Sequence, residues 1–386
     1  MTLIEIVICT VLLLMAVPDV CKKLQRQGLI YVVYAIAGVA LSAFMTPQTW
    51  PVLDQVGAFG FILLLFIIGL EIDLPPPRKA LRALLFAISW TAIQLPVLLL
   101  LTYFLELDWK EISICVVALT GCSVGIGYNC WMHYSGISHE HKQAWLFWMV
   151  ALEVLAILFL SMISHSDSEA TMNDIFLRIL GILLLVLVIA ISSRKITHFL
   201  QWLMDHTVQW KAHFIALFIF IIAAMGNRIG LSAPKTAFFL GLFMHSATCE
   251  GMGLEHYLRP IAQHLLIPVF FVGLGGMIRM EMVFSIVGLW SFLSALLLIA
   301  IREISYRRVF QKYMPGDQRA FLLLCPNLTM VAVAANAWGF SEFNKGGIWM
   351  LLTGLWMTLF SVMLLPKDQP ASSLHHIKNQ LPQKIL

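Results

Sequence analysis

Long, uninterrupted runs of apolar residues constrain the fold of this chain more than any other feature. Most of the runs are about 17 to 25 residues long, the length that an α-helix needs to cross the hydrocarbon core of a membrane. Hydrophobic residues make up 60% of the 386 residues and charged residues 12%, whereas soluble domains carry about 25% charged residues. A soluble domain of this size could not cover itself with so few charges. The sequence therefore predicts an all-α, polytopic membrane protein with the lipid bilayer as its solvent.

Polar residues, glycines and prolines divide the apolar runs into about thirteen predicted transmembrane spans. The first run has no basic segment before it and no small-residue cleavage site after it, so it is predicted to be a retained span and not a signal peptide. The predicted spans cover residues 2–17, 29–45, 55–72, 83–105, 112–130, 144–164, 174–193, 208–226, 233–247, 260–278, 283–303, 318–337 and 345–365.

The distribution of charge among the loops predicts how the chain is oriented. Basic residues fall in alternate loops, whereas the intervening loops at residues 106–111 and 166–174 are acidic or nearly neutral. Cytoplasmic loops carry the excess of Lys and Arg in membrane proteins. We therefore expect a multi-pass protein of the inner (plasma) membrane, with the N-terminus outside and the C-terminus in the cytoplasm. The basic loops hold Lys22, Lys23 and Arg26; Arg78, Lys79 and Arg82; Arg194, Lys195 and Lys211; Arg307, Arg308, Lys312 and Arg319; and the tail from Lys367.

Two halves of the sequence match each other at an offset of about 204 residues. Gly38 lies opposite Gly241, and Gly69 lies opposite Gly273. The glycine-rich fifth span likewise lies opposite the twelfth span, which contains Pro326. Glycine and leucine are common in membrane helices, so chance is the alternative explanation, but these landmarks agree on one offset. Spans one to six then correspond to spans eight to thirteen.

A shift of seven spans is odd, so the two copies are predicted to sit in the membrane with opposite orientations. Inverted repeats of this kind allow a central site to open to one side of the membrane and then to the other. The predicted organisation is a first repeat at residues 1–170, a linker helix and loop at 171–205, a second repeat at 206–366 and a short cytoplasmic tail at 367–386.

Spans five and twelve are predicted to be discontinuous helices whose free ends lie near the middle of the membrane. Discontinuous helices in matching positions of inverted repeats mark binding sites, because their free ends offer backbone amides, carbonyls and partial charges. The residues predicted to break the two helices are Gly121, Gly125, Gly127 and Pro326.

Glu153 is the clearest candidate for a functional side chain. It lies about midway along the sixth span, with no charged residue for ten positions on either side. Ionisable residues inside a membrane are costly and mark functional sites, so we expect Glu153 to bind a proton or a cation. The alternative is a protonated glutamate with a structural role. Met357 occupies the matching position in the second repeat.

Arg302 ends the eleventh predicted span and is a candidate counter-charge for Glu153, because a guanidinium does not lose its proton. The alternative is that Arg302 extends to the membrane surface beside Arg307 and Arg308. Other polar residues beside the predicted breaks can either coordinate an ion or satisfy a neighbouring backbone carbonyl. These are Thr120, Ser123, Asn129, Asn327 and Thr329.

Several classes of function are not indicated. The formal charge of +4 comes from loop residues, and no basic run with interleaved aromatic residues suggests nucleic-acid binding. The seven cysteines show neither a disulfide framework nor the spacing of a metal site. The spans hold no nucleophile–base pair and no ligand set for a metal, so no enzyme activity, metal or cofactor is expected.

Two segments resemble the Kef-type and NapA-like monovalent cation/proton antiporters. One is GAFGFILLLFIIGLEIDL at residues 57–74, and the other is LLIPVFFVGLGGM at residues 265–277. The resemblance extends over nearly all spans, from about residue 2 to residue 366. It implies homodimers in which one half of each protomer forms the dimer contact while the other half, with spans five and twelve as a crossing pair, moves as an elevator. The family's essential aspartate aligns with Glu153, with Leu152 before it, and its basic residue aligns near Arg302.

The sequence therefore predicts a secondary transporter that exchanges a monovalent cation, Na⁺ or K⁺, for a proton. Many Kef-type relatives continue into a cytoplasmic nucleotide-binding domain; this sequence shows no GxGxxG after a strand, so such a regulatory unit would be a separate subunit. Three alternatives stay open: a ligand-gated K⁺ efflux channel, a carrier of an organic solute or anion on the same fold, and a membrane sensor that does not transport.

Overall fold

The computed structural model describes residues 3–44, 50–71, 77–163, 198, 210–229, 232–244, 248–249, 252–338 and 344–366. These residues confirm the predicted all-α, polytopic fold. Among them, seven helices are long and apolar enough to cross a membrane, and four shorter apolar helices accompany them. The predicted seventh span at 174–193, most of the predicted linker at 171–205 and the tail at 367–386 lie outside the described residues.

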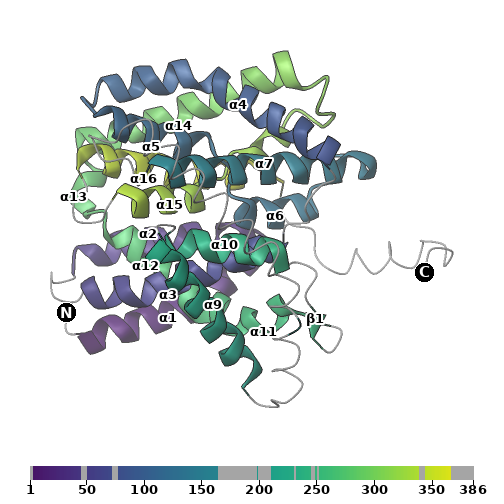
Figure 1. Cartoon of the computed structure of the whole chain (residues 1–386). Helices are drawn as coiled ribbons and strands as arrows, with labels where there is room; N and C mark the ends of the chain where they lie inside the picture. Colours follow the sequence, from purple (N-terminus) through teal and green to yellow (C-terminus); the bar gives the residue numbers. More distant parts are fainter. Residues whose placement is uncertain are drawn as a thin grey trace.

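The helices form two layers, which lie one above the other in Figure 1. The lower layer, here called the support layer, contains α1 (Leu3–Lys23), η1 (Gln27–Leu29), α2 (Ile30–Ser42), α3 (Trp50–Glu71), α9 (Lys211–Ile229), α10 (Ala233–Met244), α11 (Leu254–Ile261), the π-helical turn η2 (Ala262–Leu266) and α12 (Ile267–Gly276). Two short strands, β1 (Thr248–Cys249) and β2 (Met252–Gly253), pair antiparallel beside α11.

The upper layer in Figure 1 is here called the site layer. It contains α4 (Pro77–Tyr103), α5 (Trp109–Thr120), α6 (Val124–His133), α7 (His139–Ile163), α14 (Ile286–Ser305), the π-helical turn η3 (Tyr306–Phe310), the 3₁₀ turn η4 (Ala320–Leu324), α15 (Leu328–Trp338) and α16 (Lys345–Leu364). The short helix α13 (Met280–Val283) connects the two layers.

Polar residues at the start of several spans explain why the helices begin there. Asp108 and Glu111 form a reciprocal capping box at the start of α5. Ser285 accepts a hydrogen bond from the amide of Gly288 at the start of α14. Asn344 accepts from the amides of two following glycines at the start of α16. Each cap satisfies amides that a helix start leaves without a partner.

The packing of the helices follows the predicted repeat. Three contacts between helices recur at matching positions of the two copies: α1 with α2 matches α9 with α10, α2 with α12 matches α10 with α3, and α4 with α7 matches α14 with α16. This exchange of partners is what a two-fold axis between two copies produces.

The matching helices α3 and α12 also show that the copies are inverted. Gly57 of α3 lies against Phe270, whereas Gly60, one turn further on, lies against Leu266. The sequence of α12 and of the turn before it therefore runs backwards along α3. Two copies with the same orientation would place these helices parallel.

Glycines make the closest helix crossings of the support layer possible. A Cβ on Gly38 would lie 2.1 Å from the carbonyl oxygen of Val272, and a Cβ on Gly241 would lie 2.2 Å from that of Phe66. These two glycines occupy matching positions in the repeats. Small residues at such crossings let helix backbones approach closely in membranes, so both copies use the same packing device.

Candidate functional site

The site layer contains two helices that are interrupted at matching positions. The first interruption, Gly121 to Ser123, separates α5 from α6, and its backbone is extended at both ends. The second, Cys325 to Asn327, separates η4 from α15. Gly121 and Pro326 therefore lie within the breaks, as predicted. In each case the interruption leaves one helix end and one helix start inside the layer.

Hydrogen bonds join the two interruptions directly. The amide of Ser123 donates to the carbonyl oxygen of Pro326 at 2.6 Å, and the hydroxyls of Ser123 and Thr329 are 2.5 Å apart. All three residues come from the predicted crossing pair. The structure therefore brings Ser123 and Thr329 together at the centre of the site layer, where both side chains are buried.

Glu153 lies beside this crossing and is 0% exposed. Its carboxylate accepts a hydrogen bond of 3.2 Å from the amide of Val124, the first residue of α6. The start of a helix carries a partial positive charge and free amides, which favour an anion. The α7 helix thus presents its carboxylate to a helix start that exists only because the chain is broken at residues 121–123.

Arg302 is also 0% exposed, so it does not extend to the membrane surface. Its guanidinium donates to the carbonyl oxygens of Leu119 at 2.5 Å and Leu324 at 3.0 Å, which lie at the ends of α5 and η4. Its Nε donates to the side chain of Gln94 at 2.8 Å. Within the described residues Arg302 thus binds helix-end carbonyls and an amide and makes no ion pair with Glu153.

Asn327 holds the second interruption in place. Its backbone amide donates to the Thr358 hydroxyl at 3.1 Å. Its side-chain amide donates to the carbonyl oxygen of Leu119 at 3.4 Å. The side chain also approaches the sulfur of Met357 at 3.7 Å. Met357 is the counterpart of Glu153, so the second copy of the site has an apolar thioether where the first has a carboxylate.

The remaining candidate residues have more local roles. The Thr120 hydroxyl donates to the carbonyl oxygen of Val116 in its own helix at 2.8 Å, which is the backbone role given above as the alternative to ion binding. Asn129 belongs to α6, but its side chain lies outside the described residues.

The prediction that Gly125 and Gly127 break the helix is wrong. Both lie inside α6, because the break at residues 121–123, before Val124, is enough to end α5. The two glycines instead allow close packing. A Cβ on Gly127 would lie 2.4 Å from the terminal methyl of Met149, and one on Gly125 would lie 3.1 Å from Ile68 of the support layer.

Two buried polar residues of functional interest were not predicted. Gln94 binds Arg302. The sequence feature that could have pointed to Gln94 is its amide side chain within an apolar span, two residues before Pro96. Lys235 is buried in α10 of the support layer, and its Nζ donates to the carbonyl oxygen of Leu160 in α7 of the site layer at 3.2 Å. A search for every charge inside a predicted span finds Lys235 as it finds Glu153.

A cavity of about 270 Å³ lies between the two layers and reaches Gly125, two residues from Ser123. Among the described residues that line it, Arg259 and His264 are the only charged or titratable groups apart from tyrosines. The other lining residues are Pro18, Gln27, Ile30, Tyr31, Tyr34, Leu64, Ile67, Ile68, Tyr128, Met132, Gln263 and Ile267. The cavity lies at the end of the molecule where α1 and α6 end and α2 begins.

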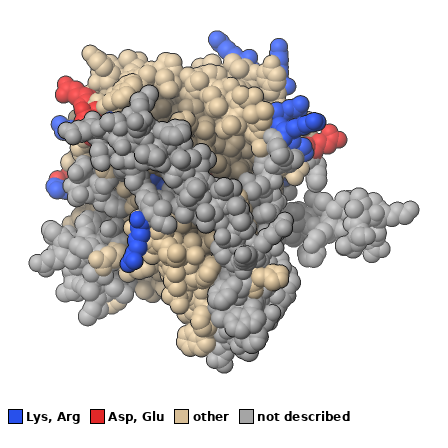
Figure 2. Space-filling model, in the orientation of Figure 1, with Lys and Arg blue, Asp and Glu red and all other residues tan. Residues whose placement is uncertain are grey.

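The same end of the molecule carries a concentration of positive charge. Figure 2 shows most of the Lys and Arg side chains of this face gathered at the right-hand end of the site layer, with acidic side chains beside them. Exposed basic residues that begin α4 or follow α14 belong to this end: Arg78, Lys79, Arg82, Arg307, Arg308 and Lys312.

Comparison with known proteins identifies similar chains. The family model described as "Sodium/hydrogen exchanger, transmembrane" matches residues 8–366. The protein named "Probable Na(+)/H(+) antiporter GerT" from Bacillus cereus is 24% identical over 78% of this chain and 78% of its own length. "Na(+)/H(+)-K(+) antiporter GerN" from the same organism is 26% identical over 64% of each chain.

Two further comparisons concern a longer protein and a solved structure. "Glutathione-regulated potassium-efflux system protein KefC" from Shigella flexneri is 26% identical over 56% of this chain, and the match spans only 36% of KefC. The structure of the sodium proton antiporter MjNhaP1 from Methanocaldococcus jannaschii superimposes with a TM-score of 0.64 over 97% of each chain, at 12% identity. That likeness concerns the fold.

Proposed function

Because the chain belongs to the transmembrane sodium/hydrogen exchanger family, we propose that it is a secondary transporter that exchanges a monovalent cation, Na⁺ or K⁺, for a proton. The observation that carries the proposal is the position of Glu153. Its carboxylate is fully buried, lies at the start of α6 and adjoins the crossing of the two broken helices. A carboxylate in this position can bind either a proton or a cation, but not both at once.

The chemistry needs one carboxylate and its polar neighbours. When Glu153 is ionised, a cation can lie near it and complete its coordination with hydroxyl and carbonyl oxygens from the crossing, including those of Ser123 and Thr329. When Glu153 is protonated, the cation loses its counter-charge and leaves. Arg302 keeps the ends of α5 and η4 fixed during this exchange, so it acts as a positioning residue.

We further propose that the site layer moves against the support layer as an elevator, within a homodimer formed through the support layer. The cavity between the layers supports this proposal, since it extends from the basic end of the molecule to Gly125, two residues from the crossing. The basic end of the molecule would face the cytoplasm of the cell whose plasma membrane holds the protein. We also propose that any regulatory unit of this transporter is a separate subunit on its cytoplasmic side.

Reconstitution into liposomes with an internal pH dye tests the exchange. Addition of Na⁺, K⁺ or Li⁺ to vesicles with a preset pH gradient should dissipate the gradient with the wild-type protein. Glu153→Gln should reduce the signal to that of empty liposomes, whereas Glu153→Asp should retain it. Glu140→Gln, an exposed glutamate in the first turn of the same helix, is the matched control. Full activity of Glu153→Gln, or no response to any cation, would exclude the mechanism.

A carrier of an organic anion is the second candidate, and the lining of the cavity favours it. Arg259 and His264 line the cavity, and its described residues include no carboxylate, so a cation is not attracted there by an acidic wall. An anion carrier would move a radiolabelled organic acid without any requirement for Na⁺ or K⁺. Flux of that kind, with no cation-dependent proton movement, would replace the exchange proposal.

A further inference from the structure

A groove at the basic end of the site layer combines an apolar wall with a basic rim. It encloses about 610 Å³ where α14 and α16 end. Met363 and Leu364 in its wall are 53% and 54% exposed, which is consistent with contact with lipid at the end of a membrane span. The apolar lining consists of Ile299, Phe321, Leu322, Met363, Leu364, Leu365 and Pro366.

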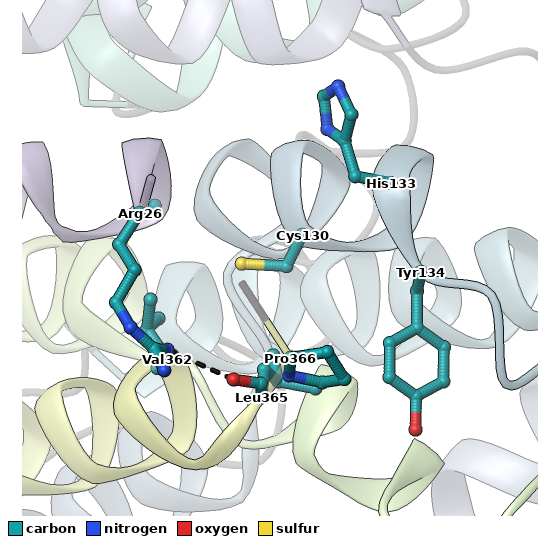
Figure 3. Close-up of a pocket in the computed structure, with 8 residues that line it drawn as sticks. Arg26, Cys130, His133, Tyr134, Val362, Leu365 and Pro366 are labelled. Atoms are coloured by element: carbon teal, nitrogen blue, oxygen red, sulfur yellow. Dashed lines mark hydrogen bonds between the residues drawn. The ribbon is translucent and has the colours of Figure 1, made fainter. Parts of the chain in front are cut away.

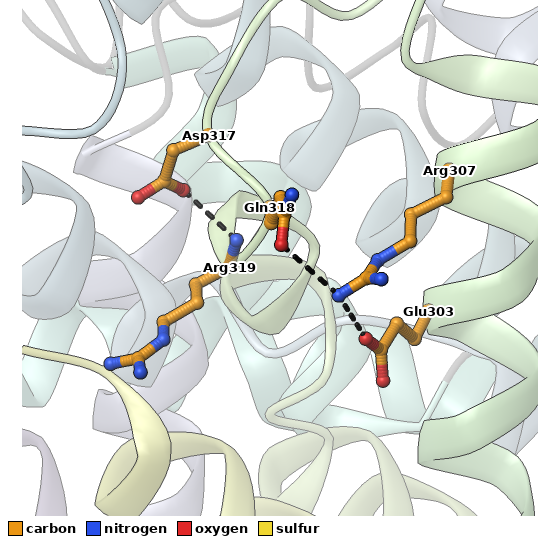
Figure 4. A network of polar contacts seen from close by, with 5 residues as sticks. All are labelled: Glu303, Arg307, Asp317, Gln318 and Arg319. Atoms are coloured by element: carbon orange, nitrogen blue, oxygen red, sulfur yellow. Dashed lines mark hydrogen bonds and ion pairs between the residues drawn. The ribbon is translucent and has the colours of Figure 1, made fainter.

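The rim of the groove carries three arginines and one glutamate: Arg26, Arg307, Arg319 and Glu303. Glu303 forms an ion pair with Arg307 at 2.5 Å, and Arg307 also donates to Gln318 at 3.4 Å (Figure 4). One acidic group therefore faces three basic groups. The rim therefore carries a net positive charge.

The guanidinium of Arg319 makes no hydrogen bond or ion pair with any residue that the structure describes. The neighbouring carboxylate of Asp317 accepts a hydrogen bond from the Tyr134 hydroxyl and another, at 3.0 Å, from the backbone amide of Arg319. Burial and the contact with Asp317 raise the pKa of Tyr134, so its hydroxyl stays a donor. Figure 4 shows the Arg319 guanidinium pointing away from Asp317.

Arg26 places this groove at the junction of the two layers. It precedes η1 in the support layer and donates to the carbonyl oxygens of Val362 and Leu365 at the end of α16, the second at 3.0 Å (Figure 3). These bonds hold the apolar end of α16 beside the basic rim. The groove is thus bordered by residues of both layers.

We propose that this groove binds an anionic phospholipid, with its phosphate at Arg319 and Arg307 and an acyl chain along the apolar wall. A planar guanidinium binds phosphate oxygens in pairs, and basic pockets at the cytoplasmic ends of spans suit anionic headgroups. A soluble anion would leave the apolar wall uncovered, whereas a phospholipid covers both parts of the groove.

Lipid binding to the purified protein tests the proposal by native mass spectrometry in detergent. The probes are phosphatidylglycerol and phosphatidylcholine with the same acyl chains. The wild type should retain phosphatidylglycerol in preference to phosphatidylcholine, and Arg319→Gln and Arg307→Gln should each weaken phosphatidylglycerol binding about tenfold. Arg308→Gln is the matched control, since Arg308 is exposed on the same π-helical turn but does not line the groove.

Three outcomes would overturn the proposal. Phosphatidylglycerol binding by Arg319→Gln equal to that of the wild type would place the lipid at a different site. Equal losses of phosphatidylglycerol binding in Arg308→Gln and Arg319→Gln would show that the lipid is attracted to the basic surface as a whole and not to the groove. Competition by inorganic phosphate as strong as that by the phospholipid would show an anion site with no role for the acyl chain. Size-exclusion profiles like that of the wild type would show that each variant is folded.

Discussion

Glu153 and Arg302 are both buried, yet each is balanced by the end of a helix and not by the other. Arg302 binds carbonyl oxygens where α5 and η4 end, and helix ends carry a partial negative charge. Glu153 binds the amide of Val124 where α6 begins, and helix starts carry a partial positive charge. The broken helices thus hold two opposite charges at separate helix ends without joining them.

At the same scale, removal of the Arg302 contacts should destabilise the protein. Arg302→Met leaves the carbonyls of Leu119 and Leu324 without this donor, and we expect a loss of about 1–3 kcal/mol in the free energy of unfolding for each acceptor left without a partner. Gln94→Leu removes one acceptor and should cost about 1–3 kcal/mol. Thermal unfolding in detergent, followed by tryptophan fluorescence, measures both.

The control for this pair is Ser89→Ala, an exposed position on α4 whose hydroxyl binds only its own helix. It should unfold with the wild-type midpoint. A Gln94→Leu variant as stable as the wild type would show that the bond between Gln94 and Arg302 contributes nothing to folding.

The sequence predicted Glu153, Ser123 and Thr329 because buried charges and broken helices are local signals. It left the position of Arg302 open, since the apolar run ends near that residue. The structure continues α14 through the π-helical turn to Phe310, which places Arg302 inside the span. Gln94 could not be paired with Arg302 in advance, because 208 residues separate them and only packing brings them together.

Among the helices, the two breaks were predictable, but their extent was not. Gly121 and Pro326 lie in the breaks, whereas Gly125 and Gly127 continue a helix. A glycine-rich segment shows that a helix is weakened, and the surrounding contacts decide which glycine is extended. The Ser123 amide bonds to Pro326 instead of to its own helix, so the crossing helix fixes the break.

Symmetry between the repeats predicts equal effects at matching glycines. Gly38→Ala and Gly241→Ala would each force a methyl group against a backbone oxygen, at 2.1 Å and 2.2 Å. We expect each to cost about 1–3 kcal/mol, because a backbone cannot yield as a side chain does. Thermal unfolding of the two variants in detergent should show similar decreases in the midpoint.

Ile36→Ala, at an exposed position of the same helix as Gly38, is the control and should leave the midpoint nearly unchanged. A large decrease for only one of the two glycine variants would contradict the prediction that both copies depend on the same crossing.

For the molecule as a whole, the repeat was predictable from the matching landmarks in the sequence. The division into a support layer and a site layer was expected from the family resemblance alone, because no pattern of residues within the chain indicates it. Helices such as α2 and α12 lie far apart in the chain, and apolar surfaces alone do not select partners within a membrane. Close crossings at Gly38, Gly241 and Gly275 select them instead.

Orientation in the membrane can be tested through the cavity between the layers. In a variant without native cysteines, Tyr128→Cys should react with a membrane-impermeant maleimide from the cytoplasmic face, because Tyr128 lines the cavity at the basic end. Phe284→Cys, exposed at the opposite end of the molecule, should react only from outside. Labelling of both from the same face would show that the predicted topology is wrong.

The use of one carboxylate, Glu153, in the proposed exchange has an electrical consequence. Leu152 precedes it and Met357 takes its place in the other repeat, so the proposed site gains one positive charge whether a proton or a monovalent cation neutralises Glu153. Both loaded forms then carry the same net charge across the bilayer. A membrane potential, worth about 2.3 kcal/mol per charge at 100 mV, would favour neither direction of exchange, and concentration gradients alone would drive it.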